Sequence, residues 1–167
     1  MGEPGVLLRT EAMMRGRLLP LLPLLACAAP NADSLKEREV AEARVVFEAN
    51  LAAIRSGDVD GYLATYLDSP DFVYLGPEGV SRGFSPFADA RRAARDFPDS
   101  LVAGAPELTW VAPGVVHVAY PFAAIQGDVT GAGWSERVLV RTRVGWRIAV
   151  TTVIPANGRR TADEDGQ

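Results

Sequence analysis

Cysteine and histidine, two residue types that carry much of protein chemistry, each occur once in this chain, as Cys27 and His117. A lone Cys forms no intramolecular disulfide, and one Cys with one His supplies too few ligands for a typical zinc site. Val116 and Val118 flank His117 in an alternating segment, so we expect the imidazole on the outer face of a strand, as a surface residue. The sequence contains no Ser-His-Asp set, no phosphate loop and no metal-ligand spacing.

The acidic residues with suggestive spacing have simpler interpretations than catalysis. Asp58 and Asp60 begin a predicted helix, where carboxylates complement the positive end of the helix dipole. Asp68 and Asp71 flank a predicted turn and are interpreted as loop formers. We therefore predict no catalytic residue, no metal and no cofactor.

The chemistry that remains is that of an apolar pocket with a few hydroxyl groups, suited to a greasy ligand with one or two polar groups. Its candidate lining is aromatic: Tyr62, Tyr66, Tyr74, Trp110, Tyr120, Phe122 and Trp134. Each of these residues can equally be a core residue. Arg141 is the best candidate for a single charged group in the pocket, although strand alternation places it outside.

The N-terminal region has the form of an export signal. Arg15 and Arg17 precede an apolar run from Leu18 to Ala26, which is much shorter than the about 20 residues that span a bilayer. We interpret residues 13–26 as a signal peptide. Residues 1–12 contain two glutamates, which are unusual before such a signal, and are interpreted as a mis-assigned start.

The last residues of the run, Leu24-Leu25-Ala26-Cys27, resemble the lipobox of bacterial lipoproteins. This resemblance implies cleavage before Cys27, acylation of its thiol and anchoring in the bacterial cell envelope. Ala28 after the cysteine favours the outer membrane, with the protein facing the periplasm. Leu25 is bulkier than the residue usual at its place. The alternatives are an ordinary cleaved signal on a periplasmic or secreted protein, and a cytosolic protein with an unusual N-terminus.

Composition and patterning divide the chain into four parts. A leader (1–26) precedes a lipidated tether (27–34), one folded domain (35–156) and a disordered polar tail (157–167). The net charge is −4, and no cluster of Lys and Arg is present, so nucleic acid is excluded as a partner.

Helical periodicity predicts three helices in the first half of the domain. The first has Ser34 as its N-cap and ends at Gly57. The second begins at Asp58. The third has Ser85 as its N-cap and stops at Pro98.

Strand patterns follow a predicted hairpin over residues 72–82. Four strands are expected: 108–112, 115–126, 134–144 and 146–154, with 127–133 as a turn region. In the strand from 134, the alternation places Val138 and Val140 inside and its arginines outside. The result is one α+β domain with helices on one face of a sheet.

These elements, with the segments DVDGYLATYLDSPDFVYLGPEGVSRG and GWRIAVTTVIP, resemble the nuclear-transport-factor-2-like superfamily, and within it the SnoaL-like group. The resemblance covers residues 35–155 and implies a cone: about three helices packed on a strongly curved, mainly antiparallel sheet, with a pocket between them. Some relatives carry a catalytic Asp at the place of Leu75, and others two His at the places of Val150 and Thr152. These groups are absent here, and Val150 and Thr152 are added to the candidate pocket lining.

Two functional hypotheses follow. The favoured one is an exported, lipid-anchored SnoaL-like domain that binds a small apolar molecule or docks a partner. The alternative is an enzyme of the isomerase, cyclase or hydrolase kind that works with Tyr and Arg residues. The expected partners are membrane lipid through Cys27, an apolar small molecule and a second copy of the chain through the sheet.

Overall fold

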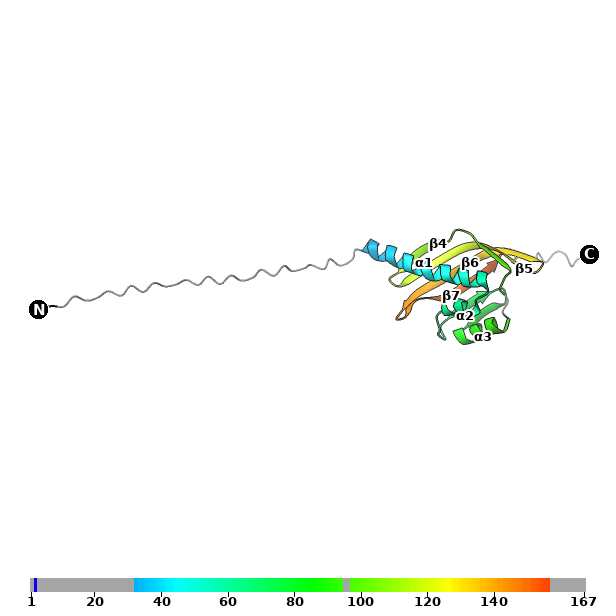
Figure 1. The fold of residues 1–167 in the computed structure, drawn as a ribbon, viewed down its shortest axis with the longest axis horizontal. Helices are drawn as coiled ribbons and strands as arrows, with labels where there is room; N and C mark the ends of the chain where they lie inside the picture. Colours follow the sequence, from blue (N-terminus) through cyan, green and yellow to red (C-terminus); the bar gives the residue numbers. More distant parts are fainter. Residues whose placement is uncertain (1, 3–31, 95–96, 157–167) are drawn as a thin grey trace, which may run out of the picture.

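The structure, a computed structural model, describes residue 2, residues 32–94 and residues 97–156 (Figure 1). The predicted signal peptide, Cys27 and the predicted tail after residue 156 lie outside the described residues. The elements, in chain order, are α1 (Ala32–Ser56), α2 (Val59–Ala64), β1 (Val73–Gly76), β2 (Gly79–Arg82), α3 (Phe84–Ala94), β3 (Ser100–Ala103), β4 (Glu107–Ala112), β5 (Val115–Gln126), β6 (Val129–Thr142) and β7 (Gly145–Pro155).

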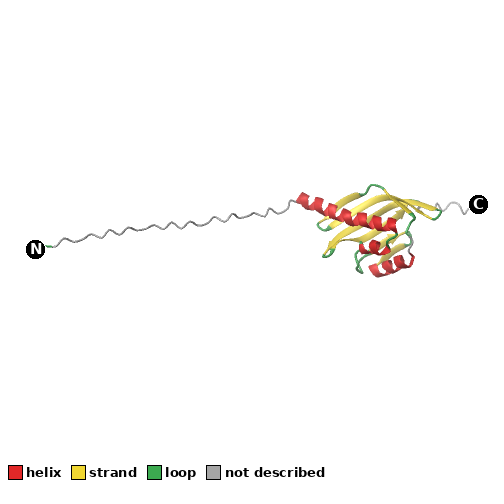
Figure 2. Ribbon diagram, in the orientation of Figure 1, coloured by secondary structure: helices red, strands yellow, loops and turns green. Residues whose placement is uncertain are grey.

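The strands form one sheet in the order β2-β1-β7-β6-β5-β3, with β4 also paired to β5. The β1–β7 pair is parallel, and the other pairs are antiparallel. Figure 2 shows the long helix α1 lying across the sheet, with α2 and α3 near its C-terminal end. The predicted α+β class is therefore confirmed.

The core lies between α1 and the inner face of the sheet. Phe47 is at the centre of α1 and is 1% exposed, and its ring meets the edge of Tyr120 on β5 at a centroid distance of 5.0 Å. Val116 and Val118 of β5 are fully buried on the same face. The alternation predicted for β5 is confirmed.

The helix starts differ from the prediction in two places. α1 begins at Ala32 and α3 at Phe84, so Ser34 and Ser85 lie within the first turns rather than at N-caps. Gly83, with φ 85°, turns the chain from β2 directly into α3. Asp58 is the N-cap of α2 as predicted, because its carboxylate accepts a 2.9 Å hydrogen bond from the Gly61 amide.

The strand prediction missed β3 and the first part of β6. β6 begins at Val129 because Gly127 and Asp128 alone make the turn, and Gln126 pairs with Val129. Gly127 has φ 56°, as a two-residue hairpin turn requires. The glycines at 131 and 133 hide this strand in the sequence, since glycine is rare inside strands.

A β-bulge interrupts the pairing of β6 with β7. Val138 lies opposite Val150, whereas Leu139 lies opposite Ile148, so Ala149 is an extra residue on β7. The bulge reverses which residues of β7 face the helices: Ile148 does so before it, and Thr151 does so after it.

Two absences apply to the part of the chain that the structure describes. None of its helices is long and apolar enough to cross a membrane. It holds no group of three or more His, Cys, Asp or Glu side chains placed to bind a metal ion.

Candidate ligand-binding site

A cavity of about 230 Å³ lies between the helices and the inner face of β3, β5, β6 and β7. Its walls are mostly apolar, and its polar groups come from two tyrosines, a serine, a glutamine and two arginines. The lining residues are Ile54, Tyr62, Arg91, Phe97, Pro98, Leu101, Tyr120, Phe122, Ala124, Gln126, Ser135, Arg137 and Val153. This composition is typical of sites for small molecules.

A larger groove of about 500 Å³ lies between α2, the start of α3 and the β6–β7 turn. Its charged residues are Asp60, Asp68 and Arg92, which are exposed, and Arg147, which is half-buried. Charges at an exposed surface are already solvated by water. The smaller cavity is therefore the better candidate site, because it contains charge removed from water.

Three of the sequence-predicted residues line the cavity: Tyr62, Tyr120 and Phe122. Two more lie close to it. The Tyr66 hydroxyl donates a 2.7 Å hydrogen bond to the Tyr62 hydroxyl, and the Tyr74 ring lies 5.7 Å from the guanidinium of Arg91, which lines the cavity.

Four predicted residues lie elsewhere. Trp110 of β4 is bonded to Glu39, near the start of α1 and far from the cavity, which begins at Ile54 near the end of that helix. Trp134 is 51% exposed. Val150 and Thr152 are paired with Val138 and Glu136 and share the outer face of the sheet with them. The placement of Val150 and Thr152 in the pocket is corrected, and the reason is the bulge at Ala149.

Leu75, at the place where some relatives carry a catalytic Asp, also faces outward. Leu75 is 40% exposed, while its neighbour Tyr74 points inward, paired with the buried Thr151. His117 lies on the outer face as expected, with its Nε2 atom 3.8 Å from a carboxylate oxygen of Glu136 on the neighbouring strand.

Arg137 is the main residue of the cavity that sequence reasoning missed. It was expected outside, but it is 4% exposed and faces inward, between the buried Val118 of β5 and Thr151 of β7. The register of the hairpin at Gly127 predicts the inward position of Arg137. Pairing Gln126 with Val129 sets Val118 opposite Arg137, and Val118 was already assigned to the inner face.

The Arg137 guanidinium is held by hydrogen bonds to neutral groups only. Its Nη2 group donates to the Tyr120 hydroxyl at 3.1 Å. Its Nη1 group donates to the Ser135 hydroxyl and to the carbonyl oxygens of Glu136, at 2.9 Å, and Thr152, at 3.5 Å. The Nε atom is buried and has no hydrogen-bond partner among the described residues.

The titration of the cavity groups is governed by burial and by their neighbours. Burial alone lowers the pKa of Arg137, but the surrounding tyrosine hydroxyls, that of Tyr120 first, favour the cation and leave its pKa raised. Burial, together with the nearby Tyr66, raises the pKa of Tyr62 well above its ordinary value. At neutral pH the site therefore contains a permanent cation, Arg137, and an un-ionised Tyr62.

A second cation lines the same cavity. The Arg91 guanidinium of α3 lies 5.7 Å from the centre of the Tyr74 ring and 5.6 Å from that of Phe87. Among the described residues that line the cavity, two are arginines and none is acidic or a histidine.

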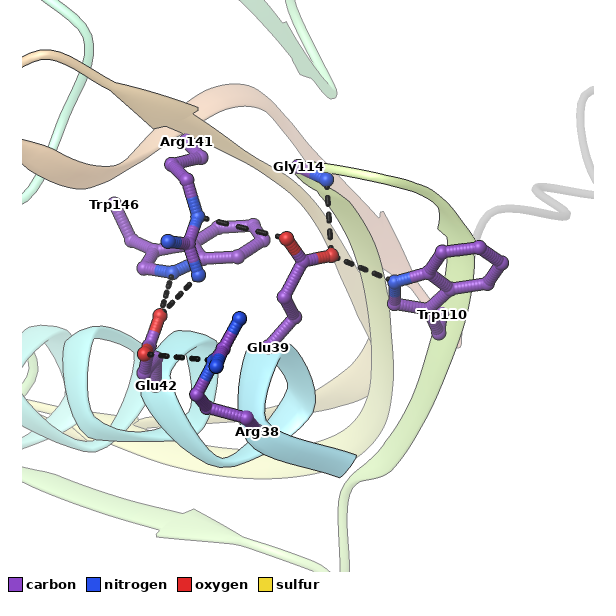
Figure 3. Close-up of polar contacts among 7 residues, drawn as sticks. All are labelled: Arg38, Glu39, Glu42, Trp110, Gly114, Arg141 and Trp146. Atoms are coloured by element: carbon purple, nitrogen blue, oxygen red, sulfur yellow. Dashed lines mark hydrogen bonds and ion pairs between the residues drawn. The ribbon is translucent and has the colours of Figure 1, made fainter. Parts of the chain in front are cut away.

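Arg141, the predicted pocket cation, lies outside the cavity and is neutralised by two carboxylates (Figure 3). Its Nε atom is 3.6 Å from Glu39, and its Nη2 group is bonded to Glu42. Glu39 also accepts hydrogen bonds from the Trp110 indole, at 2.7 Å, and the Gly114 amide, at 2.9 Å. Figure 3 shows that this acid-aromatic cluster joins the first turns of α1 to the ends of the sheet strands.

The geometry of the fold is shared with solved structures. A nuclear transport factor 2 (NTF2-like) superfamily protein from Salmonella enterica matches with a TM-score of 0.62 and 20% identity, over 78% of this chain and 99% of its own. A ketosteroid isomerase-like protein from Erwinia carotovora atroseptica matches with a TM-score of 0.61 and 19% identity, over 71% of this chain and 96% of its own. An NTF-2-like protein from Shewanella oneidensis matches with a TM-score of 0.59 and 13% identity, over 70% of this chain and 97% of its own.

These similarities show that the chain has the nuclear-transport-factor-2-like fold, as the sequence predicted. No family model matches the sequence, and no curated protein matches it. Because one fold of this kind supports many functions, the function must be argued from the cavity itself.

Proposed function

We propose that this chain is an exported, lipid-anchored SnoaL-like domain that binds a small, largely apolar molecule in the cavity lined by Tyr62, Tyr120 and Arg137. The observation that carries the proposal is the cavity's composition: apolar walls that enclose a few polar groups held in place by hydrogen bonds. Such a site favours a ligand with an apolar body and one polar end.

The size of the cavity limits the ligand. Its volume of about 230 Å³ suits one small molecule with a short apolar chain. Ile54, Leu101 and Val153 provide aliphatic surface for the apolar part. Ser135 and Tyr120 are already bonded to Arg137, so the polar end of the cavity is preorganised and little ordering is needed on binding.

The anchoring part of the proposal rests on the sequence. Cys27 follows a basic segment and a short apolar run, and the residues around it resemble a lipobox. We place the protein in the bacterial cell envelope, on the outer membrane and facing the periplasm. The alternative, a periplasmic or secreted domain without a lipid, leaves the binding proposal unchanged.

The binding proposal is tested with octan-1-ol, a neutral ligand with one polar end. The Cys27→Ser chain, which has no thiol to acylate, is titrated while the amide NMR signals of β5 and β6 are followed. Saturable shifts are expected for these strands. Ala124→Trp fills the cavity and abolishes them, whereas Ala123→Trp, on the opposite face of the same strand, leaves them intact. Equal binding by both variants, or no saturable shift in the parent chain, would refute the proposal.

A further inference from the structure

We infer that the ligand carries a carboxylate, which pairs with Arg137 while its apolar part occupies the rest of the cavity. This inference rests on the proposed function and narrows it from apolar molecules in general to small amphipathic acids. Three features of the structure support it: the missing counter-charge, the free edge of the guanidinium, and the contrast with Arg141.

The first feature is a buried positive charge without a negative partner. Arginine stays protonated in proteins, and removing an ion from water costs several kcal/mol unless another charge compensates it. Among the described residues, no carboxylate lies within ion-pair distance of Arg137, and none lines the cavity. An anionic ligand supplies the missing charge inside the cavity.

The second feature is the pattern of hydrogen bonds around the guanidinium. Three acceptors surround Nη1, which is therefore fully used. On the opposite edge, Nε has no partner and Nη2 has one, Tyr120. One N–H group on Nε and one on Nη2 thus have no acceptor among the described residues, and the two oxygens of a carboxylate can accept such bonds.

The third feature is that two arginines on one strand differ in their carboxylate partners. Arg137 and Arg141 are four residues apart on β6 and point to the same side of the sheet. Glu39 and Glu42 of α1 neutralise Arg141, which is partly exposed. Arg137 is more deeply buried and receives no acid from any described residue. The deeper cation is thus the one left for an external anion.

The experiment compares octanoate with octanamide, which has nearly the same shape but no charge. Both are titrated into the full Cys27→Ser chain at pH 7, and binding is followed by the amide NMR signals of β5 and β6. Octanoate is expected to bind at least about tenfold more tightly, because a charge-assisted, bidentate contact replaces a neutral one. Higher ionic strength should reduce this ratio only slightly, since the pair is buried.

Two variants assign the preference to Arg137. Arg137→Met should weaken octanoate binding more than octanamide binding and so remove the preference, whereas Arg137→Lys should keep part of it. A fall of equal size for both ligands in Arg137→Met would show a merely structural role and overturn the inference.

The comparison of the two ligands in the parent chain tests the inference by itself, so the result does not depend on whether the variants fold. If octanoate and octanamide bind equally, the charge inference is wrong while the binding proposal stands. If neither binds, and octan-1-ol also fails, both are wrong.

Discussion

Glu39 is a buried acid that remains ionised because several donors surround it. The Gly114 amide makes the largest contribution to lowering the pKa of Glu39, burial opposes it, and the Trp110 indole and the Arg141 charge add to the lowering. A carboxylate whose pKa is lower in the folded than in the unfolded chain stabilises the fold above its unfolded pKa. That stabilisation is lost as the pH falls through the folded pKa.

The first prediction concerns this pH dependence. At pH 7, Glu39→Gln should lower the free energy of unfolding by about 1–3 kcal/mol, because charged hydrogen bonds become neutral ones. The difference between parent and variant should be constant down to about pH 5. It should then shrink below the ordinary Glu value of 4.5, as Glu39 itself becomes protonated.

Urea unfolding between pH 3 and pH 7 measures this difference. Glu48→Gln is the matched control on the same helix, since the Glu48 side chain is 62% exposed, and it should change the stability little at any pH. A difference between Glu39→Gln and the parent that does not vary with pH would show that the Glu39 charge has no role in the cluster.

At the scale of elements, Phe47 packs the middle of α1 against the sheet. Phe47 is 1% exposed and meets the ring of Tyr120 edge to face. We predict that Phe47→Ala lowers the free energy of unfolding by about 3–5 kcal/mol, through lost burial and the cavity that it leaves. Val45→Ala, at a residue of the same helix that is 66% exposed, should cost under about 0.5 kcal/mol. Chemical denaturation checks both, and similar losses in the two variants would contradict this packing.

The first half of β6 depends on a close backbone approach. A Cβ atom on Gly133 would lie 2.2 Å from the carbonyl oxygen of Ile154 on β7, whereas a Cβ atom on Gly131 would meet nothing within 4 Å. We expect Gly133→Ala to cost about 1–3 kcal/mol and to weaken the β6–β7 pairing. Gly131→Ala should change the stability by under about 0.5 kcal/mol. Thermal unfolding together with amide exchange of β7 measures both, and equal effects would refute the close approach.

The predictions from sequence were most accurate where one side of an element is uniformly apolar. β5 has such a side, and α1 has one that is apolar apart from the buried Glu39 and Asn50. Their inner faces agree with the prediction at Phe47, Val116 and Val118. β6 does not have such a side. Its apolar Val138 lies in the middle of the outer face of the sheet, and its charged Arg137 is buried on the inner face. Alternation alone assigns the apolar residues to the core, so the prediction exchanged the inner and outer faces of this strand.

The candidate site was predicted less well than the fold for the same reason. Its aromatic wall was found in part, at Tyr62, Tyr120 and Phe122. Its charge was missed, because an arginine in a strand is expected outside and only the hairpin register places it inside. The bulge at Ala149 leaves no mark in the sequence, and it moved Val150 to the outer face.

At the scale of the whole molecule, the proposal includes a membrane anchor. We predict that growing bacterial cells incorporate a fatty-acid analogue into the protein, and that Cys27→Ser abolishes the label, because the thiol is the attachment point. Gel detection after metabolic labelling, with fractionation of membranes, makes the measurement. Cys27→Ser is expected to leave the fold intact, since Cys27 precedes the first element at Ala32. A labelled variant, or an unlabelled parent chain found outside the membrane fraction, would contradict the anchor.

The length of α1 has a consequence for such a tethered protein. At 1.5 Å per residue the helix rises about 33 Å from Ala32 to Ile54, where the cavity begins. The five peptide links from Cys27 to Ala32 add at most about 18 Å. For the lipid-anchored protein that we propose, the binding site would thus lie within about 50 Å of the lipid surface. Within this distance, the lengths of the tether and of α1 would set the effective concentration of the binding site for ligands released nearby. That concentration could be changed by altering the tether, without changing a residue that contacts the ligand.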